Sequence, residues 1–186
     1  MRKIRIPLFL LILCMMLTVF APAASADITD YTTTPQSTAR NVLLVDMDNG
    51  KELYSHNADE RAYPASTTKI LTVLLAVEAV ERGEVSVDDM VTALPGYMNG
   101  LTEDASNVGI QEGEIMSLRD LLYCAILPSA NEACNMIAMH ISGDIPSFVA
   151  LMNTRAEELG CTGSHFANTN GMPDTEHYTT ARDLYI

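Results

Sequence analysis

A hydroxyl and an amine stand one helical turn apart in the segment Tyr63-Pro64-Ala65-Ser66-Thr67-Thr68-Lys69. Side chains three positions apart on a helix are neighbours, so Lys69 can lie beside the hydroxyl of Ser66. A lysine held among apolar residues loses solvation in its charged form, which lowers its pKa and lets it accept a proton. The spacing therefore predicts a serine nucleophile, Ser66, with Lys69 as its general base.

A second candidate is the segment Ser129-Ala130-Asn131, which places a hydroxyl and an amide two residues apart. Both candidates also have a plain structural interpretation. Serine is a common helix cap, and Pro-Ser-x-Asn is ordinary chemistry for ending one helix and starting the next. The chain has only three lysines, however, so the chance expectation for a serine three residues before one of them is roughly 0.2 at average residue usage. The serine and lysine pair is therefore the more specific signal.

The residues after this pair are apolar at almost every position from Ile70 to Val80. Such a run predicts a helix that is buried on nearly every side and too short to span a membrane. Pro64 and Ser66 are typical of a helix start, whereas Arg82 and Gly83 are typical of a helix end. Ser66 is therefore expected at the N-terminus of this helix, where the first N–H groups stabilise an anion.

A hairpin is predicted before this helix. Residues 42–45 and 52–55 have the pattern of two short strands, and Asp48-Asn49-Gly50 between them is a typical turn. The hairpin marks the start of the folded region.

Two further helices are predicted in the second half of the chain. Ser117 and Asp120 form a capping box that starts one helix, which ends before Pro128. The other helix runs from Glu132 to Ser142. Residues 84–116 mix short apolar pairs with glycine and acidic residues and give no assignment.

The N-terminus has the pattern of a secretory signal peptide. Three basic residues precede an apolar run over residues 6–20, which is followed by Ala24-Ser25-Ala26. This order predicts a signal peptide over residues 1–26 and export of the rest of the chain. We expect residues 27–40 to form a loose leader and one folded domain to occupy residues 41–186.

Charge and cysteine usage narrow the function further. The formal net charge of −13 argues against nucleic acid as a partner. Cys124, Cys134 and Cys161 follow the signal peptide without the spacing of metal ligands, so at most one disulfide can form. We interpret Cys124 and Cys134 as small core residues, with a bridge between them as the alternative.

In this order, Ser-x-x-Lys opening an apolar helix and Ser-x-Asn at a helix corner resemble the motif set of the penicillin-recognising serine enzymes. From about residue 41 to the last residue, the chain is similar to the exported D-alanyl-D-alanine carboxypeptidases, which are low-molecular-mass penicillin-binding proteins. The segments that carry this similarity, beyond the two motifs, are Ser106-Asn107-Val108-Gly109, Gly113-Glu114, Leu121-Leu122-Tyr123, Phe148-Val149, Met152-Asn153, Glu158-Leu159-Gly160, His165-Phe166-Ala167-Asn168, Asn170-Gly171 and His177-Tyr178-Thr179-Thr180-Ala181-Arg182-Asp183-Leu184.

The resemblance implies an α+β fold of the β-lactamase/transpeptidase type, with an antiparallel sheet packed with an all-helical subdomain. It also implies an exported serine peptidase that acts on peptidoglycan stem peptides ending in D-Ala-D-Ala, is inhibited by β-lactams, and uses no cofactor or metal. In this family pattern Ser66 attacks the carbonyl of the penultimate D-alanine and Lys69 takes its proton. Ser129 passes a proton towards the leaving amine, while Asn131 orients Lys69 and binds a substrate amide.

One family motif, Lys-Thr/Ser-Gly, is missing because Lys69 is the last lysine of the chain. We therefore expect residues 41–186 to be a partial domain with an incomplete sheet, inactive by itself, and any membrane anchor to lie in a segment absent here. His165 and His177 fall outside the catalytic motifs and are interpreted as structural residues.

Two alternative functions remain open at this point. One is a catalytically dead penicillin-binding or interaction module, which a labelled penicillin would distinguish from an active enzyme. The other is a β-lactamase, which is less favoured because Glu157, Glu158 and Glu176 lack the Leu-Asn sequel of the commonest class.

Overall fold

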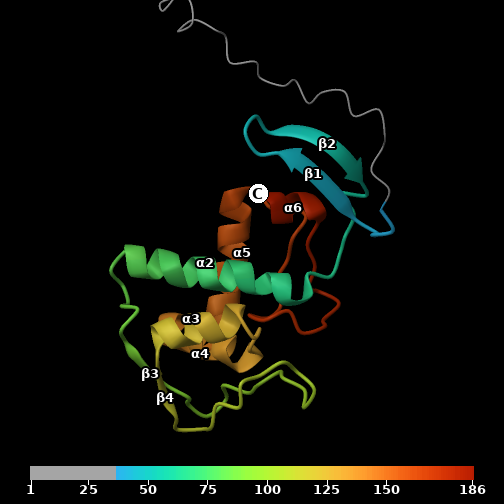
Figure 1. The fold of residues 1–186 in the computed structure, drawn as a ribbon. Coiled ribbons are helices and arrows are strands. Elements are labelled where there is room, and N and C mark those ends of the chain that lie inside the picture. The colour runs from blue at the N-terminus through green and yellow to red at the C-terminus, as the bar shows by residue number, and fades with distance from the viewer. Residues whose placement is uncertain (1–36) are drawn as a thin grey trace, which may run out of the picture. The chain divides into compact units, whose positions relative to one another are not determined.

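A computed structural model describes residues 37–186, so the predicted signal peptide and most of the predicted leader lie outside the described residues. The described chain contains two small antiparallel sheets and a set of packed helices (Figure 1). None of its helices combines the length and the apolar character needed to cross a membrane. The combination of helices and antiparallel strands confirms the predicted α+β class.

The predicted hairpin is present as β1 (Val42–Asp46) and β2 (Lys51–His56). The two strands pair in antiparallel register, with one irregularity between Leu44 and Val45. In the turn, the carboxylate of Asp46 accepts hydrogen bonds from the backbone N–H of Asp48 at 3.0 Å and the side chain of Asn49 at 2.7 Å. These local bonds explain why this short polar segment reverses the chain.

The helix after the candidate nucleophile is α2 (Thr68–Glu81), preceded by the 3₁₀ turn η1 (Ala65–Thr67). The prediction that it is buried on nearly every side is wrong. Ile70, Leu74 and Val77 lie three or four positions apart and are exposed, Ile70 by 62%. The helix buries its polar residues instead. Their hydroxyl and amine groups can be buried because they find hydrogen-bond partners inside the protein.

The stretch that the sequence left unassigned contains two short strands. β3 (Met90–Thr92) pairs with β4 (Ile115–Ser117) in antiparallel fashion. The backbone N–H of Ala93 extends this pairing by donating to the carbonyl of Glu114 at 2.8 Å. The two strands bracket the long loop that reaches the candidate site.

The next two helices match the predictions closely. α3 (Leu118–Ile126) begins where the hydroxyl of Ser117 accepts the backbone N–H of Asp120 at 3.1 Å. α4 (Asn131–Ser142) ends at Gly143, whose positive φ of 83° completes the helix stop. They contribute most of one buried cluster, which includes Leu118, Leu121, Ala125, Ala133, Cys134, Met136 and Ile137. Cys124, Cys134 and Cys161 are all free thiols in the structure.

A fourth long helix, α5 (Ile145–Leu159), was not predicted from the sequence. Asp144 caps it by accepting the backbone N–H of Ser147 at 2.7 Å. Its apolar face, including Phe148 and Met152, joins residues of α2 and α4 in a second buried cluster. The two clusters together fix α2 between the other helices.

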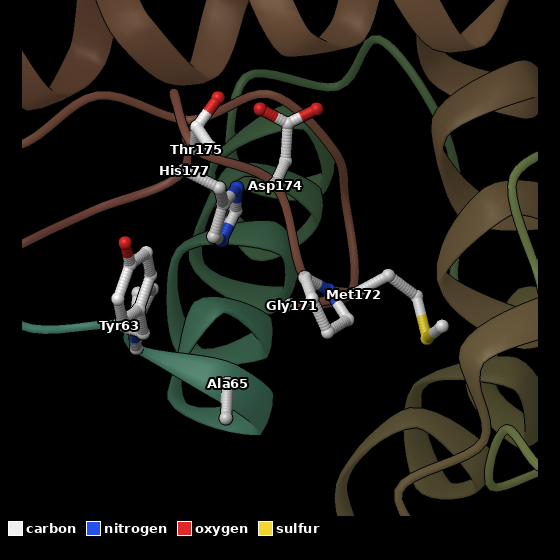
Figure 2. Close-up of a pocket in the computed structure, with 9 residues that line it drawn as sticks. Tyr63, Ala65, Gly171, Met172, Asp174, Thr175 and His177 are labelled. Atoms are coloured by element: carbon white, nitrogen blue, oxygen red, sulfur yellow. The ribbon is translucent and has the colours of Figure 1, made fainter.

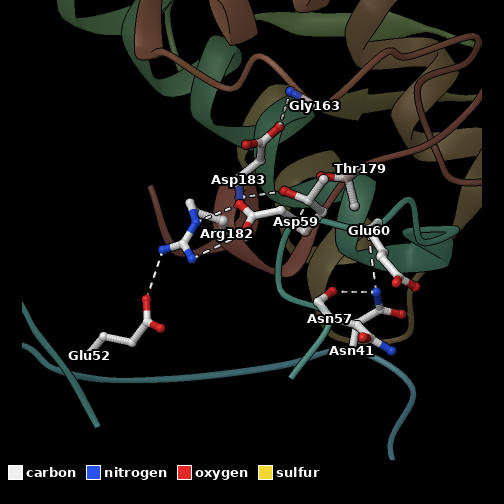
Figure 3. A network of polar contacts seen from close by, with 10 residues as sticks. Asn41, Glu52, Asn57, Asp59, Glu60, Gly163, Thr179, Arg182 and Asp183 are labelled. Carbon is white, nitrogen blue, oxygen red and sulfur yellow. Dashed lines mark hydrogen bonds and ion pairs between the residues drawn. The ribbon is translucent and has the colours of Figure 1, made fainter. Parts of the chain in front are cut away.

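The short helix α6 (Ala181–Tyr185) is tied to the hairpin by a network of polar contacts (Figure 3). The guanidinium of Arg182 contacts Asp59 at 2.6 Å and Glu52 at 3.0 Å, and its backbone N–H donates to the carbonyl of Ala58. The carboxylate of Asp183 accepts the backbone N–H of Gly163 at 2.9 Å. Residues more than a hundred positions apart are thereby held together beside the start of α2.

Candidate active site

The predicted nucleophile and base meet at the junction of η1 and α2. The Ser66 Oγ lies 3.2 Å from the Lys69 Nζ, the contact that the spacing predicted. Ser66 belongs to the 3₁₀ turn rather than to the first turn of the α-helix. Ala65, just before it, has a positive φ of 47°, which is uncommon for a residue with a side chain.

The corner between α3 and α4 brings Ser129 to the same place. Its Oγ lies 2.9 Å from the Oγ of Ser66, although the two residues are 63 positions apart. Ser129 also has a positive φ, 63°. The neighbouring N–H groups hold this corner, since Ala130 donates to the carbonyl of Cys124 and Asn131 to the carbonyl of Ser106, both at 2.9 Å.

Lys69 is almost completely buried, with only 2% of the residue exposed. Burial lowers the pKa of its amine, and the nearby acidic groups of Cys134 and Glu132 oppose this shift. Its second hydrogen bond is donated to the backbone carbonyl of Asn170 at 2.7 Å. Lys69 is therefore held by a neutral carbonyl and a hydroxyl rather than by a carboxylate, which favours a neutral amine that can act as a base.

The segment that supplies this carbonyl was not recognised as part of the site. The backbone carbonyl of Thr169, the residue before Asn170, accepts the hydroxyl of Thr72 at 2.6 Å. The segment therefore lies along the first turn of α2. At Gly171 it passes very close to the turn Ala65–Thr67 that carries Ser66, which we call the nucleophile turn. A Cβ added at Gly171 would lie 1.8 Å from the carbonyl oxygen of Ala65. Asn170-Gly171 belonged to the segments that resemble the family, but nothing in the sequence indicated contact with Lys69.

Asn131 lines the cleft, but it makes no hydrogen bond with Lys69 among the described contacts. Its side-chain amide lies 3.9 Å from the sulfur of Met172. The cleft has a volume of about 570 Å³ and is lined by Ser66, Asn131, residues 170–173 and the loop over residues 100–106. The amide is thus placed where it could meet a ligand, and its substrate-binding role stays a prediction.

Glu132, which follows Asn131, has no partner for one of its two carboxylate oxygens among the described residues. The other oxygen accepts the backbone N–H of Val108 at 2.6 Å. Glu132 thereby links the start of α4 to the end of the loop that lines the cleft. No local pattern in the sequence indicated this contact, because it joins residues 24 positions apart.

These contacts define a class of enzyme site. A serine oxygen lies within reach of a buried amine that can remove its proton and of a second hydroxyl that can relay one. Such a constellation suits acyl transfer through a covalent ester on the serine. This arrangement is the one expected of a serine acyltransferase or peptidase with a lysine base.

Comparison with known proteins defines the family. The model for peptidase S11, described as D-alanyl-D-alanine carboxypeptidase, matches residues 28–186. The chain therefore belongs to the D-alanyl-D-alanine carboxypeptidase family, which the sequence resemblance predicted.

Curated relatives and solved structures agree with this assignment. D-alanyl-D-alanine carboxypeptidase DacF of Bacillus subtilis is 34% identical over 177 residues, which are 95% of this chain and 45% of that protein. Penicillin-binding protein 5 from Haemophilus influenzae superposes with a TM-score of 0.78 at 34% identity, over 82% of this chain and 44% of that one. Penicillin-binding protein D2 from Listeria monocytogenes, in its ampicillin-bound form, superposes with a TM-score of 0.71 at 27% identity, over 82% of this chain and 61% of that one. The chain spans about half the length of the relatives that it matches.

Proposed function

We propose that the full-length protein that contains these residues is a serine-type D-Ala-D-Ala carboxypeptidase acting on peptidoglycan stem peptides. The observation that carries the proposal is the convergence of Lys69 Nζ and Ser129 Oγ on Ser66 Oγ, at 3.2 and 2.9 Å. Membership of the D-alanyl-D-alanine carboxypeptidase family supports the choice of substrate.

The geometry suggests how each residue acts. Lys69, as a neutral amine, takes the proton of Ser66 while the serine oxygen attacks the carbonyl of the penultimate D-alanine. Ser129 lies beside the same oxygen and gives its proton to the departing amine of the terminal D-alanine. The proton that Lys69 took from Ser66 then returns to Ser129, so both residues regain their starting forms. Water then attacks the ester and restores the Ser66 hydroxyl, which releases the shortened peptide.

β-Lactams are the proposed inhibitors, because they present a reactive carbonyl to the same serine. The Listeria monocytogenes relative has been solved in ampicillin-bound and cefotaxime-bound forms. Ser66, Asn131 and the cleft between them offer the corresponding place in this chain.

A direct assay tests the proposal. Full-length protein should release D-alanine from a peptide ending in D-Ala-D-Ala, and prior treatment with penicillin should block the release. A matched peptide ending in D-Ala-L-Ala serves as the control and should not be cleaved. Absence of both D-alanine release and penicillin labelling would refute the proposal and favour a non-catalytic module.

The pH dependence of acylation follows from the buried amine of Lys69. Only the neutral amine can accept the serine proton, so the rate should rise with pH and level off above the pKa of Lys69. Burial lowers this pKa from the ordinary value of 10.5, so the midpoint should fall below that value. Stopped-flow acylation by a fluorescent penicillin between pH 5 and 10.5 would measure it. A midpoint at or above the ordinary value would contradict the assignment of Lys69 as the base.

We also infer that the protein is exported and works outside the cytoplasm, since peptidoglycan is found there. The Ala24-Ser25-Ala26 site predicts that the secreted protein begins at Asp27. N-terminal sequencing of protein recovered from the cell exterior would check this. Retention of Met1 on the exported protein would contradict it.

A further inference from the structure

His177 is a buried residue that the mechanism above does not use. Only 2% of it is exposed, and its imidazole contacts the segment that carries the nucleophile. His177 lines the same pocket as Tyr63 and Ala65, which lie just before Ser66 in the chain (Figure 2). The Nε2 atom lies 2.7 Å from the hydroxyl oxygen of Thr68, two residues after Ser66 and next to Lys69.

We propose that His177 is a positioning residue for Ser66, holding the nucleophile turn through the hydroxyl of Thr68. This inference rests on the proposed acylation of Ser66. Within the part of the chain that the structure describes, no hydrogen bond joins His177 to Ser66 or Lys69, so it acts through another residue and not on the substrate.

The hydrogen bonds of the imidazole fix which nitrogen carries the proton. The backbone N–H of Ala167 donates to Nδ1 at 3.0 Å, so Nδ1 is unprotonated. In a neutral imidazole the proton then lies on Nε2, which donates to Thr68 Oγ1. Burial lowers the pKa of His177 to about 4, so the ring is neutral under physiological conditions. The edge of the ring also packs against Phe166, with the ring centroids 5.6 Å apart.

The nucleophile turn is a place where such support matters. Ala65 has a positive φ of 47°, a conformation that is strained for a residue with a side chain. Conformations of this kind persist only where the surroundings determine them strongly. Thr68 closes the turn, because its backbone N–H donates to the carbonyls of Ala65 and Ser66. A bond to its side chain therefore restrains both the strained residue and the nucleophile.

The loop that carries His177 is itself fixed at both ends against the same segment. Asn170 accepts the hydrogen bond from Lys69, and Thr179 pairs with Ala62 in an antiparallel bridge. His177 thus lies between two points, Asn170 and Thr179, at which its loop is attached to the segment that carries Ser66. Loss of the Thr68 bond should let the nucleophile turn relax, although both attachments remain.

Two substitutions at His177 separate the bond to Thr68, which positions the nucleophile turn, from the bond to Ala167, which only stabilises the loop. In His177→Asn, Oδ1 takes the place of Nδ1 and still accepts the N–H of Ala167, but nothing reaches Thr68. In His177→Gln, the amide nitrogen takes the place of Nε2 and still donates to Thr68, but the acceptor for Ala167 is lost. Thr68→Val removes the hydroxyl from the other side with little change in shape.

The experiment measures acylation of the full-length protein by a fluorescent penicillin, separating the rate constant of acylation from the affinity of the initial complex. We expect His177→Asn and Thr68→Val each to reduce the acylation rate constant by about tenfold to a hundredfold, with little change in affinity. The double variant His177→Asn/Thr68→Val should be acylated no more slowly than either single variant. His177→Gln should keep an acylation rate constant within about threefold of the wild type.

Tyr97→Phe provides a matched control, because it also removes one buried hydrogen bond, that from the Tyr97 hydroxyl to the carbonyl of Ile110 at 2.8 Å. It should lower the melting temperature without slowing acylation. Acylation of His177→Asn at the wild-type rate, or slowed no more than Tyr97→Phe, would refute the positioning role.

Ring nitrogen chemical shifts of His177 give a test that does not depend on activity. Near pH 7 they should report a neutral imidazole protonated on Nε2, and a ring protonated on Nδ1 would refute the proposed bond. If the wild type shows this tautomer but is not labelled by penicillin, the proposed function fails, and with it the positioning of an acylated serine. If the wild type is labelled and His177→Asn is labelled equally fast, the positioning role alone fails.

Discussion

In the full-length protein, replacing Ser66 with alanine is expected to abolish covalent labelling by penicillin. Ser66 Oγ is the atom on which both Lys69 Nζ and Ser129 Oγ converge, so its removal leaves no activated nucleophile. Removing the nucleophile of other serine enzymes costs about a millionfold in rate. Labelling should therefore fall below detection in gel fluorescence.

Mass spectrometry of the labelled wild type should place the adduct on the peptide that contains Ser66. Lys69→Ala should also lose acylation, because a serine hydroxyl alone is a weak nucleophile at neutral pH. Cys161→Ala is the control and should be labelled almost as fast as the wild type, since Cys161 lies outside the cleft. An adduct found on Ser129 would overturn the assignment of the nucleophile.

The second large effect is expected at Gly171. A Cβ at this position would lie 1.8 Å from the carbonyl oxygen of Ala65, and φ at Gly171 is +93°. Because the obstacle is backbone, either the segment that contains Gly171 or the nucleophile turn has to move. We expect Gly171→Ala to lower the free energy of unfolding by about 3 to 5 kcal/mol and to slow acylation strongly, since Asn170 beside it holds Lys69.

Gly160→Ala is a closely matched control. Gly160 has nearly the same φ, +88°, but a Cβ there would meet nothing within 4 Å. It should cost only the strain of the left-handed conformation, about 1 to 2 kcal/mol, and leave acylation unchanged. Chemical denaturation and penicillin labelling of the two variants would separate the clash from the strain. Equal losses of stability in both would contradict the close approach of Gly171 to Ala65.

Local signals in the sequence were enough to predict the elements that depend on local interactions. The turn at Asp48-Asn49-Gly50 and the cap formed by Ser117 and Asp120 both rest on hydrogen bonds between residues at most three positions apart. The 3.2 Å contact between Ser66 and Lys69 also follows from spacing along one segment. Such contacts can be predicted from a single sequence because the short chain segment between the partners can adopt few conformations.

The features that were missed depend on distant parts of the chain. Asn170 holds Lys69 across 101 positions, and His177 reaches Thr68 across 109. No local pattern encodes such pairs. α2 was predicted to be buried all round because its composition is apolar, yet the protein buries its hydroxyls and its amine and exposes Ile70. Composition reports the average character of a helix, whereas the site depends on which face turns inwards.

The left-handed backbone at Ala65 also matters for protein engineering. Glycine would adopt this φ without strain, but it would also give the unfolded chain more freedom, and the two effects are each about 1 kcal/mol. Ala65→Gly would therefore pass a thermal screen as nearly neutral. The same change would loosen the residue next to the proposed nucleophile, so melting temperature and turnover need not change together at this position. A variant library ranked by melting temperature alone would therefore retain variants at this position that have a lower turnover rate.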